Sequence, residues 1–137
     1  MKALNYERKM LRATIVALAN GTSENRLIQN ALLESFLIHA RLLIAFLYGP
    51  YVKHDFRPAD WLAPDKWNRV RGKKSKLLKE TYNDAHKYLA HLTATRLYQK
   101  KTWHCSAIQR EIETLLDKFF QQIQVDPPAR GNQVQGE

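Results

Sequence analysis

Hydrophobic residues recur along this chain mostly at spacings of three, four and seven, which is the period of an amphipathic α-helix. The first run of such positions lies within residues 3–19 and consists of Leu4, Leu11, Ile15 and Leu18. Gly21 follows as a natural helix stop. Alternating runs of Val, Ile and Thr bounded by turns, which would predict strands, are almost absent. The pattern therefore predicts an all-α protein whose first helix covers residues 3–19.

The second predicted helix is the longest, and it ends at Tyr48, before Gly49-Pro50. Thr22 or Ser23 can cap its first turn. The helix is apolar almost all round, yet it contains Glu34, His39 and Arg41. Because a charged group at the centre of a bilayer costs about 2.5–3.5 kcal/mol on insertion scales, these residues argue against a membrane span. The pattern instead predicts the central helix of a bundle.

Residues 50–74 read as a connection, since prolines and a glycine interrupt them repeatedly. Within this connection we expect one short helical turn over residues 55–62, with Pro58 at the first helical position. Trp61 and Trp67 are expected to pin the connection onto the helices. This long basic segment, containing proline and tryptophan, separates the second and third predicted helices.

Two further helices complete the prediction. Ser75 can cap a third helix that extends to about Tyr98, with an apolar stripe that consists of Leu78, Tyr82, Ala85, Leu89 and Leu92. Ser106 and Gln109 match a capping box that opens a fourth helix through Ile123. Residues 126–137 are expected to form a disordered tail. The sequence thus predicts a single-domain bundle of four main helices over residues 1–125.

Composition narrows the class of protein without identifying it. A chain of 137 residues can form one core, and its 45% hydrophobic and 26% charged residues are typical of a soluble globular protein. The single cysteine, Cys105, cannot form an internal disulfide, and no apolar signal segment follows Met1. We therefore expect a cytoplasmic protein.

Positive charge is concentrated in one stretch of a chain whose net charge is +9. Residues 66–79 contain seven basic side chains and no acidic one. Such a cluster attracts phosphates by electrostatic steering and counterion release. The candidate nucleic-acid-binding residues are Lys66, Arg69, Arg71, Lys73, Lys74, Lys76 and Arg96. The alternative is a solvated segment that keeps the protein soluble.

Polar residues of the second helix fall on one side of it. At about 100° per residue, Asn30, Glu34, Arg41 and Tyr48 share a narrow sector, whereas His39 lies on the far side. Burying charges is costly unless they are paired, so partners are expected on a neighbouring helix. The third helix has its own polar face, on which Asp84 and His91 lie. The prediction is an inter-helical cleft formed by Glu34, Arg41, Asp84 and His91, serving either as a site or as a satisfied core network, with His39 serving packing.

Several segments resemble a group of small, uncharacterised bacterial proteins: residues 30–41, Tyr48-Gly49, the turn at 55–61 and residues 89–93. This resemblance implies functional importance for Asn30, Glu34, His39, Arg41, His91 and Thr93. An all-helical bundle with internal Arg and His also resembles the HEPN superfamily. That resemblance implies RNA binding or cleavage, a homodimer, and a role in toxin–antitoxin or defence systems. Catalytic HEPN domains carry an Arg that is followed after a few residues by a His, a spacing that no Arg–His pair in this chain has.

The leading hypothesis is RNA or nucleotide binding by the basic segment together with Arg41, Arg96 and Lys100-Lys101. Trp67, Tyr88 or Tyr98 would stack on bases. For cleavage we expect a metal-independent attack by a 2′-hydroxyl. In that reaction Arg41, His91 and Glu34 form the catalytic group, with His91 as acid–base and Arg41 stabilising phosphorane charge. Loss of cleavage in His91→Ala, with the fold intact, is the outcome that this hypothesis requires.

The alternative is a non-enzymatic, homodimeric module that docks a protein partner through an apolar helix face, with binding that depends little on salt. No metal or cofactor is expected, because the sequence has no Gly-rich phosphate loop, no Gly-x-Ser-x-Gly and no His-Glu-x-x-His. A metal-dependent nucleotide hydrolase is also disfavoured. Glu113 and Asp117, four residues apart, are interpreted as a solvated helix face.

Overall fold

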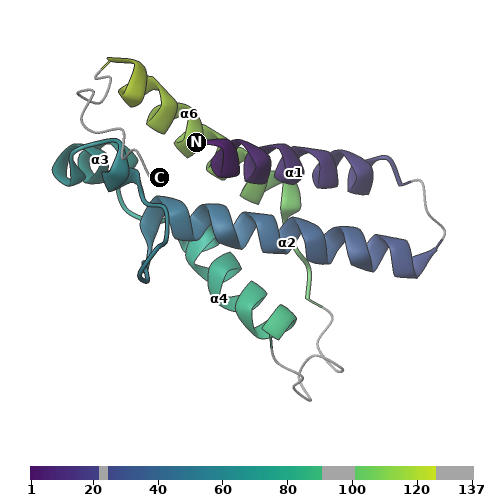
Figure 1. The fold of residues 1–137 in the computed structure, drawn as a ribbon. Helices are drawn as coiled ribbons and strands as arrows, with labels where there is room; N and C mark the ends of the chain where they lie inside the picture. The colour runs from purple at the N-terminus through teal and green to yellow at the C-terminus, as the bar shows by residue number, and fades with distance from the viewer. Residues whose placement is uncertain (22–24, 91–100, 126–137) are drawn as a thin grey trace, which may run out of the picture.

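The computed structural model describes residues 1–21, 25–90 and 101–125 of the chain. Within these ranges every regular element is a helix, and no strand is present, so the predicted all-α class is confirmed. α2 (Arg26–Tyr48) lies at the centre and contacts α1, α4 and α6; α4 extends away from it at an angle (Figure 1).

α1 (Lys2–Ala19) and α2 lie side by side along most of their length (Figure 1). α1 buries Leu4 and Leu11 of its predicted stripe. The prediction that Thr22 or Ser23 caps α2 is wrong, because the N-cap is Asn25, whose side chain accepts a hydrogen bond of 2.9 Å from the Leu27 amide. An Asn side chain satisfies one of the free N–H groups at a helix start in the same way as Ser or Thr.

The connection after α2 contains more helix than its sequence indicated. η1 (Pro58–Asp60) is the predicted turn, with Pro58 at its start. α3 (Pro64–Arg71) lies within the stretch that was predicted to be a connection, so this part of the prediction is wrong. Pro64 opens α3, Asp65 lies in its first turn, and its last turn is basic, which is the charge order that the helix dipole favours. Only Trp67 of α3 is buried, so the helix has no apolar stripe.

α4 (Lys76–Ala90) begins as predicted, since the Ser75 hydroxyl accepts a 3.1 Å hydrogen bond from the Leu78 amide. Its predicted continuation to Tyr98 lies outside the described residues. α6 (Cys105–Val125) already includes Ser106, so Ser106 is not a cap. The amide of Ile108 instead donates to the carbonyl of His104 at 3.0 Å. The tail at 126–137 is also outside the described residues.

The core lies between α2 and the helices packed around it, with buried side chains from α1, α3, α4 and α6. Phe119 of α6 is fully buried. The centre of its ring lies 5.2 Å from the ring centre of Phe46, 5.5 Å from that of Trp67 and 6.2 Å from that of Trp61. Each buried aromatic side chain contributes about 1.5–3 kcal/mol to stability. Trp61 and Trp67 therefore hold the connection onto the core, as predicted.

The length and composition of α2 alone would permit a membrane crossing, since an 18-residue window has a mean hydropathy of 1.6. In the folded chain 44% of that window is buried. A central helix of a soluble bundle meets the same criterion.

Candidate functional site

Three cationic side chains and two tyrosines form a continuous series of contacts beside the C-terminal half of α2. The Arg71 guanidinium lies 4.7 Å from the ring centre of Tyr48. The Lys74 ammonium lies 5.5 Å from the ring centres of both Tyr48 and Tyr82. Arg41 follows, with its guanidinium 5.3 Å from the ring centre of Tyr82. We call these five residues the cation–tyrosine cluster.

The end of α2 positions one half of this cluster. The carbonyl of Leu47 accepts a 2.8 Å hydrogen bond from Arg71 Nη1 and a 3.0 Å hydrogen bond from Trp67 Nε1. These two donors fasten α3 to α2, and the positive charge of Arg71 suits the negative end of the α2 dipole. Trp67 is only 3% exposed. The expectation that Trp67 stacks on a base is therefore wrong, because its ring belongs to the core.

The cations of the cluster are crowded and incompletely paired. Burial lowers the pKa of Lys74 below its usual value, and the positive charges of Arg71 and Lys79 lower it further. The Nε atoms of Arg41 and Arg71 are both buried, and among the described residues neither has a hydrogen-bond partner. An anion beside the cluster would relieve the repulsion between its cations.

A cavity of about 290 Å³ adjoins the cluster, between the end of α3, the start of α4 and α6. Arg71, Lys73 and Arg110 supply three cations to its lining, against the single carboxylate of Glu111. The Ser75 hydroxyl donates to Glu111 at 2.5 Å and caps α4. The cavity is therefore positively charged and adjoins the N-terminus of α4, where the first backbone N–H groups attract anions.

The predicted nucleic-acid-binding residues divide into several groups. Arg71, Lys73 and Lys74 take part in the cluster or its cavity, together with Arg41. Arg69 is exposed on α3, and Lys66 of α3 is half-buried. Lys76 is the first residue of α4 and lies 3.7 Å from the Glu80 carboxylate. Arg96 lies outside the described residues.

The predicted polar cleft has a different set of contacts in the structure. Arg41 contacts Tyr82, whereas Asp84 pairs with Lys101, so Asp84 and Arg41 are not each other's partners. Glu34 is half-buried on α2, and Asn30 is exposed. His91 and Thr93 lie outside the described residues. The role of Tyr82 was not found from the sequence, because it was assigned to the apolar stripe of the third helix.

His39 takes part in a polar pair on the opposite side of α2. Its Nδ1 atom lies 2.5 Å from the Glu7 carboxylate of α1, and its ring is edge-on to that of Tyr6 at 6.0 Å. His39 is buried and therefore contributes to packing between α1 and α2. Sequence reasoning did not single out Glu7, since its position depends on the register between the two helices.

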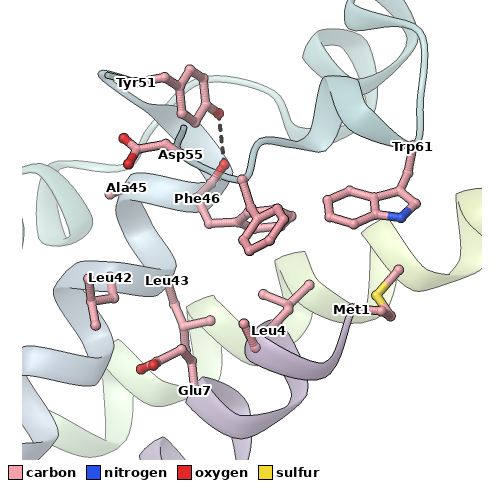
Figure 2. Close-up of a pocket in the computed structure, with 12 residues that line it drawn as sticks. Met1, Leu4, Glu7, Leu42, Leu43, Ala45, Phe46, Tyr51, Asp55 and Trp61 are labelled. Carbon is pink, nitrogen blue, oxygen red and sulfur yellow. Dashed lines mark hydrogen bonds between the residues drawn. The ribbon is translucent and has the colours of Figure 1, made fainter. Parts of the chain in front are cut away.

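A second cavity, of about 200 Å³, lies between α1, α2 and the segment that follows α2 (Figure 2). In Figure 2 Phe46 lies between Trp61 and Leu42, and the Tyr51 hydroxyl donates to the Phe46 carbonyl at 2.7 Å. Most of its lining is apolar. The two carboxylates of the lining already accept hydrogen bonds, Glu7 from His39 and Asp55 from the Val52 amide. The cation–tyrosine cluster is consequently the stronger candidate for binding a charged ligand.

Other site chemistries find less support. Among residues 1–21, 25–90 and 101–125, no group of three or more His, Cys, Asp or Glu side chains could hold a metal ion. Burial raises the pKa of the Cys105 thiol, which disfavours the reactive thiolate. No protein-family model, curated protein or solved structure matches the chain.

Proposed function

We propose that the protein binds single-stranded RNA or nucleotides through the cation–tyrosine cluster and the adjoining basic cavity. One observation carries the proposal: three cations converge on two tyrosine rings, beside a cavity whose lining has three cations and one carboxylate. The proposal takes the four longer helices as one bundle domain over residues 1–125, in the cytoplasm.

A phosphate group satisfies the chemistry of this region. Guanidinium groups present several N–H donors in a fixed plane, which suits phosphate oxygens. Lys73 and Arg110 extend the positive surface along the cavity, so that consecutive phosphates of a strand would meet consecutive cations. The net charge of +9 adds long-range attraction for a polyanion.

Bases have stacking surfaces in the same region. Tyr48 and Tyr82 are half-buried, and arginine guanidinium planes also stack on bases. Stacking on such groups depends little on base identity, so recognition of single strands rather than of a particular sequence is expected. Tyr88 is half-buried too, with its ring 5.9 Å from that of Trp103.

Catalysis is a separate question from binding. Cleavage by Arg41, Glu34 and His91 stays a prediction, because His91 lies outside the described residues. The toxin–antitoxin or defence role likewise rests on the HEPN resemblance. The second candidate, a non-enzymatic homodimeric interaction module, is favoured by exposed apolar side chains on and after α2, of which Leu27 is 75% and Phe56 is 60% exposed.

Charge-removing variants test the proposed site. Lys73→Gln and Lys74→Gln should each weaken binding of a fluorescein-labelled single-stranded RNA and reduce the slope of log affinity against log salt by about one phosphate contact. Lys9→Gln is the matched control, because it removes the same charge from an exposed position on α1. Displacement of the labelled RNA by an unlabelled mononucleotide would show that a single nucleotide is enough for binding at this site.

Equal losses in Lys9→Gln and Lys74→Gln would contradict the assignment, since affinity would then depend on net charge and not on this site. Unchanged affinity in both cluster variants would contradict it as well. Circular dichroism of each variant establishes that the helices are intact.

A further inference from the structure

The outer face of α2 carries apolar side chains that the other described helices leave exposed. Ile38 is 45% exposed, Leu42 46% and Leu27 75%. In Figure 1 α1 and α4 flank α2 on opposite sides, and no described helix lies in front of it. The segment after α2 adds Val52 at 68% and Phe56 at 60% exposure. Exposed apolar side chains gathered on one face of a helix are typical of interaction sites.

The exposed face has the spacing of a helix-pairing seam. Its successive positions are three or four residues apart and consist of Leu27, Ala31, Glu34, Ile38, Leu42 and Ala45, with Arg41 beside Leu42. Such a repeat keeps one line of side chains facing a partner helix along several turns. Because Ala31 and Ala45 are small, the partner helix can approach closely near both ends.

The residues of this seam are ordered so that the seam can pair with a second copy of itself that runs in the opposite direction. Glu34 lies four residues before Ile38, and Arg41 lies three residues after it. Ala31 and Ala45 are each seven residues from Ile38. We propose that the outer face of α2 binds the α2 of a second copy of this chain, antiparallel, with a two-fold axis at Ile38.

This arrangement pairs opposite charges twice. Glu34 of each copy meets Arg41 of the other, because a two-fold axis relates every contact to an identical one. A parallel pair would instead place Glu34 against Glu34 and Arg41 against Arg41, which is unfavourable. A carboxylate has about four acceptor sites, so contacts of Glu34 within its own chain leave capacity for Arg41 of the partner subunit.

The ends of the seam also match. Leu27 lies eleven residues before Ile38, so it meets the partner chain just after that chain's α2 ends, close to Val52 and Phe56. Leu42 and Ala45 line the cavity of Figure 2 and belong to the same seam, so its opening lies beside the interface. The most exposed apolar side chains of α2 and of the following segment are thereby covered together. The proposal does not rest on RNA binding, although Arg41 belongs to both surfaces.

The molar mass of the full chain in solution tests the interface. By light scattering coupled to gel filtration the wild type should be a dimer, and Ile38→Asp should be a monomer with unchanged helical content. Val16→Asp is the matched control, since Val16 is 56% exposed on α1, away from the seam. A monomeric wild type, or a dimer that survives Ile38→Asp, would overturn the proposal.

Charge exchange tests the antiparallel register and does not depend on the Ile38 variant folding. Glu34→Arg and Arg41→Glu should each weaken the homodimer on the order of tenfold, because like charges then face each other at both ends. A 1:1 mixture of the two variants should form a heterodimer tighter than either homodimer. Absence of this preference in the mixture would refute the register, whereas losses of RNA affinity in either variant bear only on the proposed function.

Discussion

Glu113 of α6 joins two arginines of α1, and it shows how single residues hold the bundle together. Arg12 donates to both Glu113 carboxylate oxygens at 2.7 Å, and Arg8 Nε donates to one of them at 2.8 Å. Arg8 also pairs with Asp117 at 2.5 Å. The interpretation of Glu113 and Asp117 as a solvated face is therefore wrong for Glu113, whose side chain is 14% exposed. A bidentate arginine pair that is partly buried fixes the register between the two helices.

This network makes stability depend on pH. Burial pushes the pKa of Glu113 upward, but hydrogen bonds from Arg12 and Arg8 outweigh it, and the net pKa lies below the usual value of 4.5. A carboxyl with a lowered folded-state pKa contributes stability above its unfolded pKa and loses it as the pH falls through the folded pKa. Urea unfolding at decreasing pH should thus show a loss below about pH 4.5 that is smaller in Glu113→Gln.

The exposed Glu80 provides the comparison for this experiment, since it lies on α4, 3.7 Å from the ammonium group of the solvent-exposed Lys76. Glu80→Gln should leave the acid-induced loss as it is in the wild type. The interpretation fails if Glu113→Gln and the wild type lose stability in parallel over the whole acidic range.

At the scale of elements, α3 shows what joins the basic segment to the bundle. It is an eight-residue helix whose single buried residue, Trp67, packs on Phe119 and donates to the Leu47 carbonyl. Arg71, the last residue of α3, donates to the same carbonyl. The placement of the cation–tyrosine cluster therefore depends on how α3 docks against the end of α2.

Trp67→Phe tests this docking. The substitution keeps an aromatic ring but removes the 3.0 Å hydrogen bond to Leu47 and part of the packing. We expect a loss of about 1–3 kcal/mol in the free energy of unfolding, measured by urea denaturation. Arg71 still donates to that carbonyl, so the helical content of the folded variant should be unchanged. A free energy of unfolding equal to that of the wild type would show that the docking of α3 does not depend on Trp67.

The long helices could be predicted from the sequence because each buries a stripe that repeats every three or four residues. α3 could not, since one buried residue makes no period. The start of α2 was misplaced because several neighbouring residues, Asn25 among them, are suitable N-caps and tertiary packing selects one. In the candidate site, Arg41 was identified from its place on the polar side of the second helix, and the basic segment from its charge. The contacts of these cations with Tyr48 and Tyr82 were not predicted, because a contact between segments depends on how they pack.

At the scale of the whole molecule, different surfaces carry different chemistry. The α1–α6 contact is fastened by ion pairs, the end of the bundle near α3 carries the cation–tyrosine cluster, and the outer face of α2 carries exposed apolar side chains. Part of the net charge of +9 is concentrated at the end of the bundle near α3, where cations outnumber carboxylates. Binding of a polyanion to this end is the central claim.

The most direct test is a titration of fluorescein-labelled single-stranded RNA with the wild-type protein at 50 and 200 mM salt. With three to five phosphate contacts, affinity should fall roughly 20- to 100-fold between these concentrations, because bound counterions are released from the RNA. That result, together with a smaller fall in Lys74→Gln, would support the proposed site. No binding at either salt concentration would contradict it and leave the basic segment with a role in solubility.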